Sequence, residues 1–123
     1  MQHEHLTEMI IGCAYKVYNT MGYGFLESVY KNCMLIELKN CGLEAESERP
    51  LKVNYNGQIV GEFRADIIVN DNVIVELKSV SQIVPAHEVQ LVNYLVATGK
   101  NVGLLLNFAE KEVQVKRKVK NLN

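Results

Sequence analysis

Three ionisable residues interrupt the apolar segment FRADIIVNDNVIVELK (residues 63–78): Asp66, Glu76 and Lys78. The Val, Ile and Phe residues around them are typical of two strands in a buried sheet. Ionised side chains in such a segment are costly unless they are paired, solvated or bound to a metal ion. Two carboxylates and a lysine at this spacing therefore indicate either a salt-bridge network or a site for metal-assisted chemistry.

The loop between the two strands decides how these side chains face one another. Within VIVELK, the alternation of side chains places Glu76 and Lys78 on the same face of the strand. If Val69 pairs with Val73 across the three-residue loop NDN, the two carboxylates lie opposite each other, with Cβ atoms about 4.5–5.5 Å apart. A shift of one residue would place Asp66 and Glu76 on opposite faces of the sheet.

Opposed carboxylates repel each other, so a cation between them would be stabilising. Mg²⁺ takes oxygen ligands and keeps several waters. Lys78 beside such an ion could position or deprotonate a water, or stabilise the charge that develops on a phosphate. In the alternative, Glu76 and Lys78 form salt bridges with each other, or with Arg64 and Glu62 on a solvated face. The residues by themselves leave both interpretations open.

Two further polar patterns lie in segments with helical periodicity. The first is His87, Gln90 and Tyr94, a polar stripe along an otherwise apolar helix. The second is Glu27 near the start of a helix, with Tyr30 one turn later. Each has a plain structural alternative, because the stripe could face solvent and Glu27 could simply interact with the helix dipole.

Periodicity and turn signals predict the elements that would position these residues. Helices are expected at about 6–21, 26–40 and 85–98, the last opened by Pro85 and ended by Gly99. The segments AESERPLKVNY and QIVGEFRADIIV flank Asn56-Gly57, a strong hairpin signal, and Pro50 predicts an edge or irregular strand there. VIVELK, NVGLLLNF and EVQVKR complete an ααβββαββ order, which favours one mixed sheet flanked by helices.

Composition limits the class of protein. The length of 123 residues fits one ordinary domain, and a net charge of −1 gives no strong attraction to nucleic acid or membrane. The tail KEVQVKRKVK is either a basic rim or a solvated edge strand. Three cysteines without CxxC spacing favour a reducing compartment. With no signal-peptide pattern and no apolar run of membrane-spanning length, the cytoplasm is the expected location.

The motif Gly24-x-x-Glu27-x-x-Tyr30 resembles the signature of the GxxExxY proteins, and the resemblance continues through GEFRADIIV, VIVELKSV, HEVQLVNYL and GLLLNF. That family is placed in the PD-(D/E)XK nuclease superfamily. The resemblance runs from about residue 6 to residue 117 and implies a single nuclease-like domain over residues 1–123. Its α/β fold would have a restriction-endonuclease-like core of αβββαβ order, here with one helix added before it and one strand after it.

Carried over position by position, the resemblance implies ligands for Mg²⁺, or Mn²⁺ as an alternative: the side chains of Asp66, Glu76 and Glu27 and the backbone carbonyl of Leu77. It implies catalytic roles for Asp66, Glu76, Lys78 and Gln90, the last as part of a QxxxY motif, with Tyr30 and Tyr94 in support. One departure is that Ala65 stands where the superfamily name has proline.

The function that follows from this resemblance is Mg²⁺-dependent hydrolysis of phosphodiester bonds in DNA or RNA, with DNA the preferred expectation. A homodimer is among the states it allows, since many relatives cut duplex DNA as pairs. A second interpretation is a catalytically weak nucleic-acid-binding or protein-interaction module that keeps the nuclease fold. A third is a structural or oligomeric protein whose acidic residues form a buried salt-bridge network.

Overall fold

The structure is a computed structural model that describes residues 3–120. Its elements follow the chain in this order: α1 (Glu4–Met21), α2 (Glu27–Asn40), β1 (Ala45–Ser47), β2 (Pro50–Tyr55), β3 (Gln58–Arg64), β4 (Ile67–Val69), β5 (Val73–Lys78), α3 (Pro85–Thr98), β6 (Val102–Phe108) and β7 (Val113–Val119). The α+β class, the expected helices and the mixed sheet are confirmed, with a core consistent with a restriction-endonuclease-like fold.

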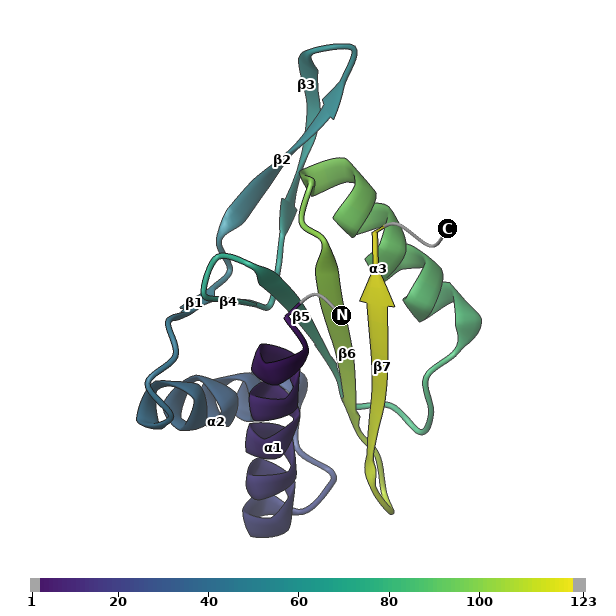
Figure 1. The fold of residues 1–123 in the computed structure, drawn as a ribbon. Coiled ribbons are helices and arrows are strands. Elements are labelled where there is room, and N and C mark those ends of the chain that lie inside the picture. The colour runs from purple at the N-terminus through teal and green to yellow at the C-terminus, as the bar shows by residue number, and fades with distance from the viewer. Residues whose placement is uncertain (1–2, 121–123) are drawn as a thin grey trace.

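The strands form two sheets rather than one. The main sheet has the order β1-β4-β5-β6-β7, in which β5 and β6 are parallel and the other neighbours are antiparallel. Strands β2 and β3 pair only with each other, and this hairpin projects from the body of the molecule (Figure 1).

Each of the two long strands expected at about 45–55 and 58–69 is therefore divided. Between β1 and β2, Glu48 has a positive φ of 58° and Pro50 begins the second piece, so the chain turns out of the sheet. On the way back the chain leaves β3 at Arg64 and joins the main sheet again at Ile67. The segment that carries Asp66 is therefore a junction between two sheets and not the middle of a strand.

Helices cover both faces of the main sheet (Figure 1). The α1 and α2 side packs Ile10 and Met34 against a strand face that includes Val75 and Leu77. On the other face, the buried residues of α3 and the sheet are Leu91, Leu95, Ile68, Ile74 and Leu105. Neighbouring residues of β5 thus enter different cores, as the predicted alternation requires.

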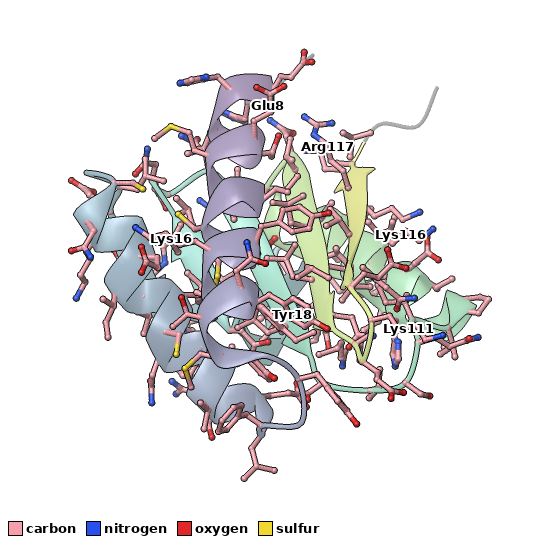
Figure 2. All side chains as sticks on the ribbon, turned by 90° about the horizontal axis from the view of Figure 1, so that it is seen from below. Glu8, Lys16, Tyr18, Lys111, Lys116 and Arg117 are labelled. Atoms are coloured by element: carbon pink, nitrogen blue, oxygen red, sulfur yellow. The ribbon has the colours of Figure 1, made fainter. Side chains whose placement is uncertain are left out.

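One close approach fixes the position of α3 on β6. A Cβ placed on Gly103 would lie 2.9 Å from Leu91 Cδ1, so only glycine lets the helix pack this closely without rearrangement. On the opposite face, the Tyr18 hydroxyl of α1 donates to the backbone oxygens of Ala109 and Glu110, both at 2.7 Å, and so ties α1 to the β6–β7 connection (Figure 2). None of the helices within residues 3–120 combines the length and the apolar character needed to cross a membrane.

Candidate active site

The β4–β5 hairpin has the register predicted from its loop. Val69 lies opposite Val73, and Ile67 lies opposite Val75. Asp66 immediately precedes β4, and its backbone N–H donates to Glu76 Oε2 at 2.9 Å. The N–H of Leu77 in turn donates to Asp66 Oδ2 at 2.8 Å. The two carboxylates are therefore adjacent, and each is oriented by a backbone N–H from the opposite segment of the hairpin.

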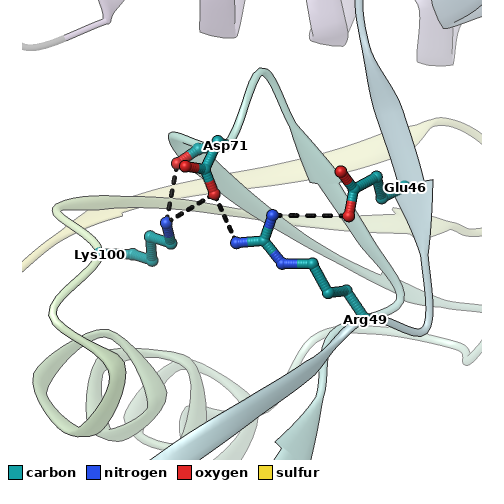
Figure 3. A network of polar contacts seen from close by, with 4 residues as sticks. All are labelled: Glu46, Arg49, Asp71 and Lys100. Atoms are coloured by element: carbon teal, nitrogen blue, oxygen red, sulfur yellow. Dashed lines mark hydrogen bonds and ion pairs between the residues drawn. The ribbon is translucent and has the colours of Figure 1, made fainter.

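A network around the NDN loop holds this register in place (Figure 3). The Asp71 carboxylate accepts from the Arg49 guanidinium and from Lys100 Nζ, the latter at 2.9 Å. Lys100 Nζ also donates to the backbone oxygen of Asp71 at 2.8 Å. These two cations lower the pKa of Asp71 to about 2, with Lys100 the larger cause. The loop is thus fixed to both the β1–β2 link and the α3–β6 link.

Burial opposes ionisation of both carboxylates. The pKa of Glu76 is raised from its ordinary value of 4.5 to about 8, first by burial and then by the negative charge of Asp66. The pKa of Asp66 is also raised, mainly by burial, against the opposing hydrogen bond from Leu77. The positive charge of Lys78 lowers the pKa of each but does not offset burial. The pair therefore takes up either a proton or a cation more readily than exposed carboxylates would.

The salt-bridge alternative that involves Arg64 is not what the structure contains. Arg64 Nη2 lies 3.1 Å from Glu62 Oε1, and Arg64 Nη1 donates to the backbone oxygen of Glu48 at 3.2 Å. Glu62 also pairs with Lys52, at 3.4 Å, along the projecting hairpin. These exposed pairs lie within β2 and β3, so Arg64 and Glu62 pair along the projecting hairpin and not with Glu76 and Lys78.

Glu27 is exposed and is the first residue of α2, so it approaches Asp66 from the α2 side of the sheet. Together with Lys31, Asp66 and Leu77 it lines a small hollow of about 110 Å³. Glu27 and Asp66 thus share a hollow, while Glu76 is connected to it through its hydrogen bond with the Asp66 backbone.

The expected three-carboxylate cluster is not seen as one group. Among residues 3–120, no three side chains of His, Cys, Asp or Glu lie together in a way that could hold a metal ion. The structure instead offers a carboxylate pair, Asp66 and Glu76, with Glu27 lining the same small hollow as Asp66. Glu27 is separate from the pair because it belongs to a different element, α2. Its side chain is exposed and can adopt other rotamers.

Tyr30 is fully buried, so it lies behind the site and not in it. Its hydroxyl donates to the backbone oxygen of Gly22 at 2.6 Å, and its ring stacks on Phe108 with centroids 4.2 Å apart. The loop held in this way includes Gly24, whose φ of 104° strains any other residue. Gly24, Glu27 and Tyr30 together thus form a loop-to-helix junction that fixes where α2 begins.

On α3, Tyr94 lies within electrostatic reach of Glu76, whereas His87 bonds to the start of its own helix. Burial and the negative charge of Glu76 raise the pKa of Tyr94, and a hydrogen bond from the Gln90 side chain opposes them. The Tyr94 ring stacks on Phe63, with centroids 3.6 Å apart. His87 Nδ1 instead accepts from the backbone N–H of Val84 at 3.2 Å, so it caps the helix.

Sequence reasoning missed Glu48. Its backbone N–H donates to the carbonyl oxygens of Ala65 and Asp66, and its negative charge raises the pKa of both Asp66 and Glu76. Lys31 Nζ lies 3.2 Å from Glu48 Oε2 and so links α2 to this acidic region. No motif marks Glu48, because its place depends on the left-handed turn that divides β1 from β2.

Comparison with known proteins accords with this geometry. No curated protein matches the chain. A solved structure described as the crystal structure of SSO0001 shares the fold, with a TM-score of 0.61 and 20% identity over 98% of this chain. The match covers 60% of that protein, so this chain spans about three fifths of its length. A family model described as the PD-(D/E)XK nuclease superfamily matches residues 4–119, and the chain therefore belongs to the PD-(D/E)XK nuclease superfamily.

Proposed function

We propose that this protein is a nuclease that hydrolyses phosphodiester bonds with the help of Mg²⁺ or Mn²⁺ at Asp66, Glu76 and Lys78, and that it belongs to the GxxExxY branch of its superfamily. The observation that carries the proposal is the pair of adjacent, half-buried carboxylates whose ionisation is opposed by burial. Membership of the superfamily supports it, because these nucleases generally use divalent metal ions. DNA is the preferred substrate over RNA in this proposal.

The donor atoms fit a hard divalent cation. One oxygen of each carboxylate, Asp66 Oδ2 and Glu76 Oε2, accepts a backbone N–H. Within residues 3–120 the second oxygen of each accepts no further hydrogen bond and is available to a metal ion. The Leu77 carbonyl and Glu27 are the additional oxygen donors of the proposal. Carboxylate and carbonyl oxygens are the ligands that Mg²⁺ prefers in proteins. When bound, the ion would polarise a phosphate oxygen and an attacking water.

The remaining steps fall to the residues of the chain. The backbone N–H groups of Asp66 and Leu77 keep the two carboxylates oriented, so little reorganisation is needed when substrate binds. Lys78 places an ammonium beside them, where it positions the attacking water or offsets the charge that develops on the phosphate. Tyr94 and Gln90 would support the site from the α3 side, where the charge of Glu76 already raises the pKa of Tyr94.

The test is cleavage of labelled single-stranded, duplex and branched DNA and of RNA, each in Mg²⁺, Mn²⁺ and EDTA. We expect cleavage with a divalent ion and none in EDTA. Glu76→Ala and Lys78→Ala should each lower the rate by at least about 100-fold, the scale for losing electrostatic stabilisation of the transition state. Lys16→Ala, which removes an exposed lysine on α1, is the matched control and should leave the rate unchanged (Figure 2). Failure to cleave any substrate, or activity that survives both site substitutions, would refute the proposal.

A second candidate is a module that binds nucleic acid, or a protein partner, with little or no turnover. It is favoured by one observation, namely that no three candidate ligand side chains are grouped within the described part of the chain. This candidate predicts nucleic-acid binding of equal strength by the wild type and by Glu76→Ala, without cleavage in either ion. The cleavage assays, together with a binding measurement on the wild type and Glu76→Ala, therefore separate the two candidates.

A further inference from the structure

A larger hollow adjoins the candidate site on the side of α2. It has a volume of about 430 Å³ and is lined by residues 23–27, 79–81 and 108–110. Glu27 lines both this hollow and the small one that contains Asp66. Residues 79–81 directly follow Lys78, so one wall of the hollow continues from β5, the strand that carries Glu76 and Lys78. We propose that this hollow is a subsite for one unpaired nucleobase of the substrate strand, next to the phosphate held at Asp66 and Glu76.

The aromatic side chains of the hollow suit the flat face of a base. Tyr23 is 55% exposed and Phe25 is 41% exposed, so both rings are accessible from the hollow that they line. Phe25 is also held in place: its ring meets Tyr30 edge to face with centroids 6.0 Å apart, and its backbone oxygen accepts from Ser79 Oγ at 2.7 Å. A fixed ring is preorganised for stacking, which reduces the entropy lost on binding.

The charge of the lining selects a base over a phosphate. Glu27 and Glu110 contribute carboxylates, and the lining as described in residues 3–120 contains no Lys, Arg or His. A phosphate would be repelled there, whereas a neutral base offers an apolar face to the rings and hydrogen-bonding edges to Ser81 and the backbone. The volume also falls within the range of about 300–1,000 Å³ that is typical of small-ligand sites.

The position of the hollow relative to the strands supports the same occupant. It lies at the carboxyl ends of β5 and β6, which are parallel neighbours. In open α/β sheets, ligands bind outside the carboxyl ends of the parallel strands. A strand whose phosphate lies at the carboxylate pair would thus place a neighbouring base over Tyr23 and Phe25, provided that the base is not paired with a complementary strand.

The subsite rests on the proposed function, and its test uses binding rather than turnover. In the Lys78→Ala protein, which should not cleave, affinities are measured by fluorescence anisotropy for single-stranded oligonucleotides with one abasic nucleotide at successive positions. We expect a loss of about 5- to 150-fold at one position, the range for base–aromatic stacking. Adding Tyr23→Ala should abolish that position-specific loss. Adding Tyr55→Ala, a 68% exposed tyrosine on the projecting hairpin, should preserve it.

A second measurement guards against a folding defect in the variants. Tyr23 is exposed, so its truncation should not alter the thermal unfolding midpoint, and Phe25→Leu keeps an apolar side chain. A 2-aminopurine base at the sensitive position should be quenched on binding, and less so in Tyr23→Ala and Phe25→Leu.

The outcomes separate this proposal from the proposed function. If intact oligonucleotides bind but no abasic position weakens binding, or if the loss persists in Tyr23→Ala, the subsite is refuted while the nuclease proposal stands. If the protein self-associates in a way that Tyr23→Ala abolishes, a second copy covers the hollow and the subsite is refuted. If no nucleic acid is bound or cleaved, both proposals fail.

Discussion

Replacing Glu76 by Gln should remove most of the pH dependence of stability of the metal-free protein. The pKa of Glu76 is raised from 4.5 to about 8, so the folded protein holds this proton at pH values where the unfolded chain has released it. Its contribution to stability is therefore fully present below pH 4.5 and is lost as the pH rises through about 8. At about 1.4 kcal/mol per pKa unit, the loss amounts to roughly 5 kcal/mol in the free energy of unfolding.

A loss of that size is a large part of the stability of an ordinary domain, which is about 5–15 kcal/mol. It is measured by urea denaturation in EDTA at several pH values between about 5 and 9. The wild-type free energy of unfolding should fall as the pH rises to about 8 and level off above it. Glu76→Gln cannot ionise and keeps an oxygen that accepts the Asp66 N–H, so its curve should be much flatter. Glu8→Gln, at an exposed residue of α1, should follow the wild type.

The same denaturation experiment can be repeated with a divalent metal ion in place of EDTA. If Mg²⁺ binds the ionised pair, it should restore wild-type stability at about pH 8 and have little effect near pH 5, because binding then competes with protons. Glu76→Gln should respond weakly at both pH values. Parallel pH curves for the wild type and Glu76→Gln, or a wild type that becomes more stable as the pH rises, would refute the reasoning from burial.

Three further predictions concern the elements that hold the site. Gly103→Ala should cost about 1–3 kcal/mol of stability, because the added Cβ overpacks against Leu91. At Gly12 an added Cβ meets nothing within 4 Å, so Gly12→Ala should cost nothing. Urea denaturation compares the two variants. Tyr30→Phe removes the hydrogen bond to Gly22 and should cost about 0.5–1.5 kcal/mol of stability, with faster amide exchange in residues 22–27. Unchanged exchange would contradict the role of Tyr30 in holding this loop. Asp71→Ala should lower both the unfolding midpoint and any cleavage rate, and a normal midpoint would show that the loop network is dispensable.

Much of the fold could be read from local patterns. The Asn56-Gly57 turn, the helix opened by Pro85 and the alternation in β5 all appear as predicted. The β4–β5 hairpin has the register that a three-residue NDN loop predicts, while the sequence also left open a shift of one residue, because every residue of β4 is apolar and either face can be buried. The adjacency of Asp66 and Glu76 follows from that register. The division of the long strands was signalled only at Pro50, since backbone turns at residues such as Glu48 have no distinctive sequence.

The sequence by itself thus determined the helices and limited the β4–β5 hairpin to two registers, one of which brings Asp66 and Glu76 together, because these features depend on periodicity or on a short turn. Only the tertiary structure decided that Glu48 approaches the pair, that Tyr30 is buried behind the site, and that Glu27 borders two hollows. It also decided how far burial raises the pKa of Glu76. These properties arise where separate elements pack together, and packing between distant segments leaves no periodic trace in either of them.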